Sequence, residues 1–244
     1  MCLSEDGQMI QVSFLKRESF IIHGFGNKYL NEKFLNKESP YNRFRKQYLK
    51  QKHSDVIHII KSETNEVLGG DGFMTSLPQV LLVIKTADCL PVLLADTRNK
   101  VIGAVHCGWR GTGKRILQKA LTMMKDDLLC QESSLFAALG PSICGECYEV
   151  GTEVYDFYKK RSHPMHVFKE HPEKEKKYFL DLKRANQLQL HELGVGKDRI
   201  FCVDECTYEN KRFLSYRRNR NKKRRMLNFI GMSFDSIVEK IKRG

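Results

Sequence analysis

The sequence predicts an α+β fold in which mixed β-sheets pack together and helices lie outside them. Short apolar segments bounded by turn residues recur along the chain and are typical of buried strands. The central three are Val80–Ile84, Leu90–Ala95 and Val101–Val105. Amphipathic helical segments are interspersed without strict strand–helix alternation, which favours mixed sheets. Because the chain shows no internal repeat and no linker-like stretch, we expect a single domain over residues 1–244.

In the first third of the chain, apolar periodicity and turn residues predict the elements. In order, we expect an opening hairpin (Met9–Leu15 and Phe20–Ile22), a polar loop (Asn27–Ser39), a helix beginning after Pro40 and covering Tyr41–Leu49, a strand (Val56–Ile60) and a tight glycine turn (Gly69–Gly72).

The remaining elements are predicted from capping residues and amphipathic spacing. In order, we expect a helix capped by Thr112 or Gly113, a strand (Leu135–Leu139), a helix (Val150–Lys159), a helix capped by Asp181 and ended by Gly194, three strands (Arg199–Val203, Phe213–Tyr216 and Met226–Ile230) and a closing helix (Phe234–Ile241).

Composition sets limits on the class of protein. The chain has 244 residues, of which 41% are hydrophobic, so it is long enough to bury a large core. It contains no run of eighteen apolar residues, and its N-terminus lacks the pattern of a signal peptide. We therefore expect a cytoplasmic protein without a membrane segment. Its eight cysteines are too few for a disulfide scaffold, so we expect them to be free, metal-bound or reactive.

The formal net charge of +13 predicts attraction to polyanions and to phosphorylated or anionic small molecules. Much of the excess lies in Arg217–Arg225 and in Lys159–Lys177. A solvated loop and an anion or nucleic-acid patch are both compatible with these runs. Because the first run contains no aromatic residue, a platform for stacking single-stranded bases is disfavoured.

Three residues at predicted strand ends are candidates for a metal site. His53 precedes a strand, Cys89 links two strands, and His106 ends a third strand. Two imidazoles and one thiolate suit zinc, and three protein ligands leave a fourth position for water or substrate. A cysteine hydrolase is the competing interpretation, in which His106 activates Cys89 and Asp71 or Asp88 orients the imidazole.

A second group of cysteines offers a rival metal site. Cys144 and Cys147, together with Cys202 and Cys206, are candidates for a structural four-thiolate zinc site. The second pair is spaced one residue wider than the commonest pattern. A redox Cys-x-x-Cys is disfavoured because the first pair lies in a Gly-Pro loop.

Six sequence blocks, in order, resemble the signatures of the laccase-domain (YfiH-type) family, also labelled polyphenol oxidoreductase or purine nucleoside phosphorylase. The resemblance runs from about His23 to Ile230. The blocks are Gln51–Asp55, Asp71–Thr75, Thr86–Leu94, Ala104–Gly111, Gly140–Gly151, and Cys206-Thr207 with Phe213–Arg218.

The resemblance implies an α+β fold and a metal site formed by His53, Cys89 and His106. It implies phosphorolysis of purine nucleosides (adenosine, inosine, guanosine and methylthioadenosine) with adenosine deamination, and copper-dependent laccase activity in some members. Zinc is the expected metal and copper the alternative, because eight scattered histidines do not predict a multicopper cluster. The chain departs from the family pattern at Lys52, at Asn219 and at Cys107, which adds a thiol beside the expected site.

The expected small-molecule partners are a nucleoside and phosphate. Arg43 and Arg110 are the candidate phosphate ligands, because a guanidinium binds oxyanions bidentately; each has an ordinary structural role as its alternative. Asp71 is expected either to protonate the departing base or to fix the glycine turn. A basic binding protein with a structural metal is the competing class of function. The oligomeric state is not predicted.

Overall fold

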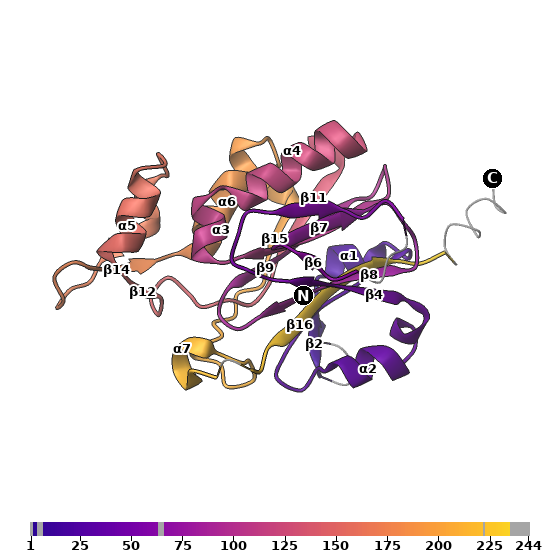
Figure 1. The fold of residues 1–244 in the computed structure, drawn as a ribbon, viewed down its shortest axis with the longest axis horizontal. Coiled ribbons are helices and arrows are strands. Elements are labelled where there is room, and N and C mark those ends of the chain that lie inside the picture. The colour runs from indigo at the N-terminus through magenta and orange to yellow at the C-terminus, as the bar shows by residue number, and fades with distance from the viewer. Residues whose placement is uncertain (1, 4–6, 63–65, 222, 235–244) are drawn as a thin grey trace.

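The computed structural model describes residues 2–3, 7–62, 66–221 and 223–234 (Figure 1). These residues form mixed sheets with helices outside them, so the expected α+β fold class is confirmed. A single domain over the whole chain stays a prediction. Within the same residues, no helix is both long and apolar enough to cross a membrane.

Two large sheets form the centre of the described molecule. The first has the order β1-β2-β3-β16-β8-β4-β6 and the second the order β15-β11-β9-β10-β7-β5. The strands of the first sheet are β1 (Cys2–Leu3), β2 (Met9–Gln11), β3 (Ile21–Gly26), β16 (Met226–Met232), β8 (Val80–Thr86), β4 (Arg45–Lys50) and β6 (Leu68–Gly69). Those of the second are β15 (Ile200–Cys202), β11 (Leu135–Leu139), β9 (Leu90–Asp96), β10 (Val101–Cys107), β7 (Gly72–Thr75) and β5 (Ile57–Ile59).

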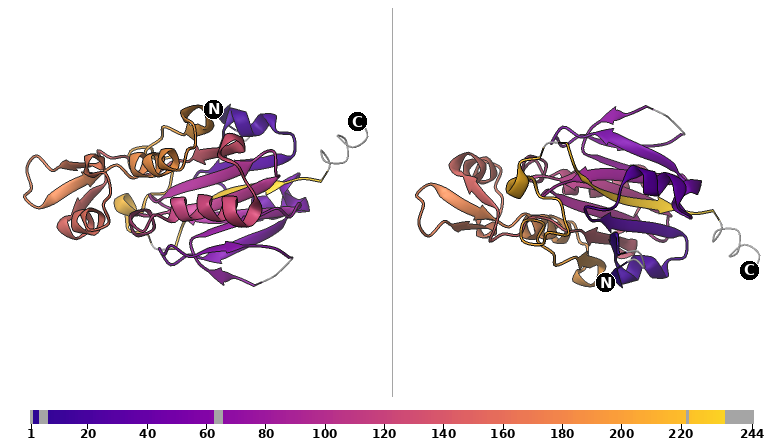
Figure 2. Two further views of the ribbon diagram at one scale, coloured as in Figure 1. Left: turned by 90° about the horizontal axis from the view of Figure 1, so that it is seen from above. Right: turned by 90° about the horizontal axis from the view of Figure 1, so that it is seen from below.

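A small sheet and α5 extend from one end of the molecule (Figure 2). This sheet has the order β12-β14-β13, with β12 at Glu149–Gly151, β14 at Lys177–Leu180 and β13 at Phe168–Glu170. The helices are α1 (Ser13–Arg17), α2 (Glu32–Lys37), α3 (Trp109–Gly113), α4 (Ile116–Leu128), α5 (Thr152–Lys159), α6 (Leu182–Glu192) and α7 (Tyr216–Asn219). Short 3-10 turns lie at Tyr41–Arg43, Glu132–Ser134, Met165–Val167 and Lys197–Arg199.

The two large sheets pack face to face, and each is covered by helices on its outer side. Leu82 and Ile84 of β8 share one buried cluster with Leu93 and Ala95 of β9, between the sheets. Because side chains alternate along a strand, the intervening residues face outward. Leu81 and Val83 contribute to a cluster with Leu35 of α2.

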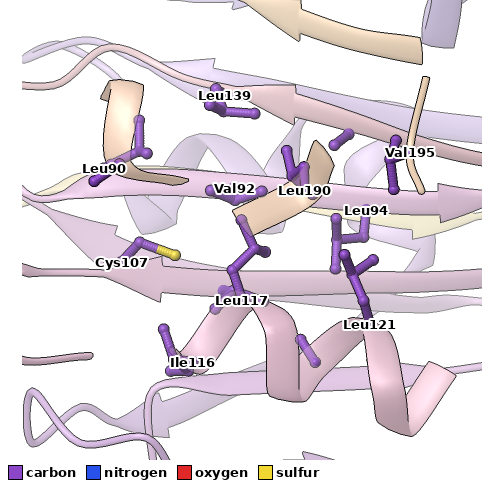
Figure 3. Close-up of a cluster of buried hydrophobic side chains, with 14 of the residues drawn as sticks. Leu90, Val92, Leu94, Cys107, Ile116, Leu117, Leu121, Leu139, Leu190 and Val195 are labelled. Atoms are coloured by element: carbon purple, nitrogen blue, oxygen red, sulfur yellow. The ribbon is translucent and has the colours of Figure 1, made fainter. Parts of the chain in front are cut away.

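On the other side of the molecule, Val92 and Leu94 of β9 pack beneath Leu117 of α4 (Figure 3). Figure 1 shows α4 and α6 above this sheet and α2 below the other. Burial on both faces explains why the central strands are almost wholly apolar rather than alternating.

Several predicted elements differ from the structure. The helix expected over Tyr41–Leu49 is wrong: a 3-10 turn ends at Arg43 and β4 follows. Gln47 and Leu49 are buried with a strand period of two, and pairing with β8 outweighs the local helical spacing. The loop expected over Asn27–Ser39 contains α2, whose cap is Asn31, because its side chain accepts a hydrogen bond from the Phe34 amide at 3.1 Å.

Two further predictions need correction. The opening hairpin pairs β2 with β3 as expected, but Ser13–Arg17 between them is helical. The strand expected over Phe213–Tyr216 does not form, because Ser215 caps α7 through its hydroxyl and the Arg218 amide (3.1 Å). The closing helix expected over Phe234–Ile241 lies outside the described residues from 235 onward. The cap at Asp181 is confirmed.

Candidate functional site

Three connections from the first large sheet to the second lie together at one edge of the two sheets. The strands β4, β6 and β8 are mutually parallel, and each is followed by a connection into the other sheet. These connections carry His53, Asp71 and Cys89. The fourth residue, His106, lies in β10 opposite Pro91 at the start of β9, so it reaches the same edge from the opposite direction.

The three predicted metal ligands lie together. Ligand atoms of His53, Cys89 and His106 all lie within 4.8 Å of one another. The two imidazole rings meet edge to face, with 4.9 Å between their centroids. His53 is exposed and Cys89 half-buried, whereas His106 is buried. The group is therefore buried at His106 and open to solvent at His53.

Asp71 holds this group in place through hydrogen bonds. Its fully buried carboxylate accepts hydrogen bonds from the amides of Lys52, His53 and Ser54, from the Ser54 hydroxyl (2.7 Å) and from Nδ1 of His106 (2.8 Å). Burial opposes ionisation, but His106 and Ser54 hold the pKa of Asp71 well below its usual range. The carboxylate thus shapes the His53 loop and fixes the His106 ring, leaving Nε2 of His106 as the atom available to a ligand.

The charges within the group are mutually dependent. Burial alone raises the pKa of Cys89, but His106 and His53 lower it overall. Burial likewise favours neutral His106, but the charges of Cys89 and Asp71 raise its pKa. The protein therefore favours a thiolate at Cys89, and a thiolate is the form of cysteine that binds metals or attacks electrophiles.

Gly108 is a residue of this site that sequence reasoning missed. A Cβ atom at Gly108 would lie 3.1 Å from Sγ of Cys89, 3.3 Å from Cδ2 of His53 and 3.7 Å from Cε1 of His106. Its φ of −76° is open to any residue. Space beside the three side chains, rather than backbone freedom, is therefore what glycine provides here.

Asp88 does not orient His106. Its carboxylate accepts hydrogen bonds from the Thr207 hydroxyl (2.7 Å) and the Arg217 amide (2.6 Å). Of the two carboxylates considered from the sequence, only Asp71 contacts the imidazole. Asp88 instead joins the Cys89 connection to the loops that follow β15.

Tyr148 and Arg217 border the site, although neither was expected there from the sequence. The Arg217 guanidinium lies 5.3 Å from the centre of the Tyr148 ring and donates to the Glu149 carbonyl (2.8 Å). Burial and the nearby charge of Cys89 raise the pKa of Tyr148, whereas Arg217 and Arg110 oppose this rise. The Tyr148 hydroxyl therefore stays protonated. Both residues belong to blocks of the family resemblance, and Arg217 also begins the basic run Arg217–Arg225.

The two predicted phosphate ligands are placed differently. Arg110 is exposed on α3, with its guanidinium 4.2 Å from the centre of the Trp109 ring and close enough to Tyr148 to influence its pKa. Arg43 precedes β4, whereas His53 follows it. Six residues of strand span about 20 Å, so the structure does not bring Arg43 to the cluster.

Cys107 lies outside the site, contrary to the expectation that it adds a thiol there. Neighbouring strand residues point to opposite faces. Cys107 enters the core beneath α4 (Figure 3), whereas His106 faces the site. It is fully buried, and burial raises the pKa of its thiol well above the usual value. Cys107 is therefore an apolar core residue.

The second predicted metal site has a different composition. Cys144, Cys147 and Cys206 lie together with Glu209 in place of Cys202. The Cys202 thiol is outside this group, and its sulfur accepts a hydrogen bond from Nε2 of Gln187 at 3.1 Å. The predicted set of four thiolates is therefore wrong.

The basic run after Ser215 does not form one uninterrupted exposed patch. Arg218 donates to the carbonyl oxygens of Thr207 and Phe213, the latter at 2.7 Å, and Arg224 donates to the Lys28 carbonyl at 3.3 Å. With Arg217 bound to Glu149, these side chains hold loops together. This use of the run weakens the interpretation of the chain as a polyanion-binding protein.

Similar proteins support a relationship over most of the chain. Residues 30–233 match the family described as multi-copper polyphenol oxidoreductase laccase. Two relatives are each named purine nucleoside phosphorylase. The Deinococcus radiodurans protein is 38% identical over 72% of this chain and 66% of its own length, and the Aquifex aeolicus protein is 32% identical over 84% and 89%. The match to the first relative thus spans slightly less than two thirds of it.

Solved structures with the same fold include two bacterial proteins. The Bacillus licheniformis hypothetical protein YfiH superposes with a TM-score of 0.83 at 24% identity, covering 93% of this chain and 97% of that one. YlmD from Geobacillus stearothermophilus gives 0.79 at 26% identity, covering 88% and 93%. The family resemblance found in the sequence is confirmed, and the chain belongs to the multi-copper polyphenol oxidoreductase laccase family that its residues 30–233 match.

Proposed function

We propose that this protein is a metal-dependent purine nucleoside phosphorylase that cleaves adenosine, inosine, guanosine and methylthioadenosine, with adenosine deamination as a side activity. The observation that carries the proposal is the convergence of His53, Cys89 and His106 over buried Asp71. Relatives at 32–38% identity that bear the name purine nucleoside phosphorylase support the reaction class.

The donor set suits zinc. Two imidazole nitrogens and one thiolate are ligands that zinc accepts, and three protein ligands leave one position open. The Asp71–His106 contact is the carboxylate–histidine pairing typical around such ions. When bound, zinc would polarise an oxygen ligand and lower the pKa of bound water. His53, Cys89 and His106 are the residues that we propose hold it.

The remaining groups have proposed roles in binding. We propose that Arg110 and Arg217, whose charges both act on Tyr148, bind phosphate beside the cluster. The protonated Tyr148 hydroxyl is a donor for a sugar or phosphate oxygen. Asp71 acts as a positioning residue, because all of its oxygens are engaged by the His53 loop and His106. Arg43 as a phosphate ligand stays a prediction.

Copper-dependent oxidation of phenols is less well supported. Among the described residues, two groups of metal-binding side chains are close enough to share an ion, and neither contains more than two histidines. Multicopper oxidation needs a His₂Cys centre and a further cluster rich in histidine. The three-residue group provides only the first part of that requirement.

The test is phosphate-dependent release of base from adenosine and inosine by protein of known zinc and copper content. We expect ribose 1-phosphate to form in equal amount with free base, and Cys89→Ala to lose more than about 100-fold in turnover, because even neighbours of metal ligands cost 10–100-fold. Cys202→Ser, which changes a thiol outside both clusters, is the matched control.

Conversion of adenosine to inosine without phosphate measures the deaminase reaction separately. No base release from zinc-replete protein would contradict the proposal.

A cysteine hydrolase is the second candidate, because Cys89, His106 and Asp71 also form a nucleophile–base–carboxylate series. The two functions differ in their need for metal. A hydrolase keeps its activity in chelator, and its Cys89 becomes covalently acylated by an activated ester. Activity that disappears with the metal and returns with zinc would exclude the hydrolase.

A further inference from the structure

A second cluster of potential metal ligands lies apart from the proposed active site. Sulfur atoms of Cys144, Cys147 and Cys206 and a carboxylate oxygen of Glu209 all lie within 4.8 Å of one another. Three sulfur ligands and one oxygen around a zinc ion are separated from one another by about 3.5–4 Å, given bond lengths near 2.3 Å for sulfur and 2.0 Å for oxygen. An upper limit of 4.8 Å on the separations is compatible with a tetrahedral site after small side-chain adjustments.

The backbone around these cysteines is arranged like that of a thiolate ligand loop. The amides of Cys147 and Tyr148 both donate to the Cys144 carbonyl, at 3.1 and 3.0 Å, so Cys144–Cys147 forms one compact turn. The Cys144 amide donates to Sγ of Cys206 at 3.4 Å. An amide that points at sulfur stabilises the thiolate over the thiol. Two segments more than fifty residues apart in sequence thus present their sulfurs to one point.

Charge argues for a cation at that point. All three cysteines are half-buried, and among the described residues no lysine or arginine forms an ion pair with the Glu209 carboxylate. Three thiolates and one carboxylate carry four negative charges once the thiol protons are displaced, and a bound divalent cation compensates part of that charge.

We propose that Cys144, Cys147, Cys206 and Glu209 bind a second zinc ion with a closed, structural coordination shell. Three thiolates select a soft divalent ion such as zinc over magnesium or calcium. Four protein ligands leave no position for substrate, unlike the group at Cys89.

The position of the site gives the ion a mechanical role. The Ile143 amide, next to Cys144, donates to the Asp88 carbonyl at 3.0 Å. The Thr207 hydroxyl, next to Cys206, donates to the Asp88 carboxylate at 2.7 Å. An ion bound by both Cys144 and Cys206 therefore holds the Ile143 and Thr207 loops in contact with Asp88, the residue before Cys89. The second zinc would therefore stabilise the connection that carries Cys89, and it would do so without contacting substrate.

Metal stoichiometry of the purified, reduced protein tests this proposal. We expect two zinc ions per chain in the wild type and one in Cys206→Ser, with two retained in Cys202→Ser. Glu209→Gln is the milder variant, which should keep the fold and weaken binding of the second ion. Equal zinc content in wild type and Cys206→Ser would overturn the proposal.

Cobalt separates the two sites by their number of thiolates. In Cys89→Ala protein loaded with Co²⁺, we expect strong thiolate-to-cobalt charge-transfer absorption, which disappears when Cys206→Ser is added. If the absorption is absent from Cys89→Ala, the cluster does not bind the ion. A non-reduced protein that is lighter by two hydrogens and resists labelling at Cys144 and Cys147 would instead identify a disulfide and contradict the site.

Discussion

The two thiol clusters of this protein use cysteine in opposite ways. At the first, Cys89 faces two histidines, and one of them is fixed by buried Asp71, so its thiolate is favoured before any ligand arrives. At the second, burial and then the neighbouring sulfurs raise the pKa values of Cys144 and Cys147, so their thiols keep their protons. The comparison shows that proximity of ligand atoms is not enough to define a reactive site, because the groups around them determine which protonation state is stable.

Replacing Asp71 tests whether its contact with His106 distinguishes the first cluster from the second, and it is the change with the largest expected effect. In Asp71→Asn the His106 ring loses its anionic partner, and we expect zinc affinity at the first site to fall about 10–100-fold. Turnover should fall with it. Equilibrium zinc titration with a competing chelator measures the affinity.

Asp55→Asn is the control, because Asp55 is a surface carboxylate paired with Lys114 at 3.3 Å. Its zinc affinity should equal that of the wild type. If Asp71→Asn binds zinc as tightly as the wild type while its thermal midpoint falls, Asp71 only supports the loop and the contrast between the clusters is smaller than we infer.

The pH dependence of thiol labelling tests the protonation states directly. In reduced, metal-free protein the pKa of Cys89 lies below that of an ordinary thiol and those of Cys144 and Cys147 lie above it. As pH rises, Cys89 therefore becomes a thiolate first. At pH 7 we expect iodoacetamide to label Cys89 at least about tenfold faster, since one pKa unit changes the thiolate fraction about tenfold. Peptide mass spectrometry over time measures each rate.

His106→Asn should remove this advantage, because it removes the largest favourable charge beside Cys89. Cys89, Cys144 and Cys147 are each half-buried, so the change in each labelling rate with pH, rather than its absolute value, is compared. Equal labelling rates at Cys89 and Cys147 across the pH range would contradict the assigned difference.

Filling the space at Gly108 should have the smallest effect. A Cβ 3.1 Å from the Cys89 sulfur forces a shift of a few tenths of an ångström within the first cluster. We expect Gly108→Ala to lower turnover severalfold with an unchanged unfolding midpoint. Gly103→Ala in β10 is the matched control, because its new Cβ would have no neighbour closer than 3.5 Å. Wild-type kinetics for Gly108→Ala would show that the first cluster tolerates movement.

Sequence reasoning succeeded where local signals were strong. The apolar runs at Val80, Leu90 and Val101 became buried strands, and the cap at Asp181 formed as expected. It failed over Tyr41–Leu49, where helical spacing lost to pairing with β8, and over Asn27–Ser39, where the short Asn31-capped helix was overlooked. Cys202 was wrongly grouped because spacing along a chain does not reveal which way a side chain points.

By itself, the sequence determined the apolar strands, the central helices and most of the side chains able to bind a metal, though not Glu209, because these follow from the chemistry of side chains and their local periodicity. The tertiary structure alone decided which of them meet. His53, Asp71 and Cys89 converge because β4, β6 and β8 run parallel and all cross to the second sheet at the same edge. Cys107 is turned away from its neighbour His106 by the strand's alternation. Those outcomes depend on long-range strand pairing, which no stretch of sequence contains.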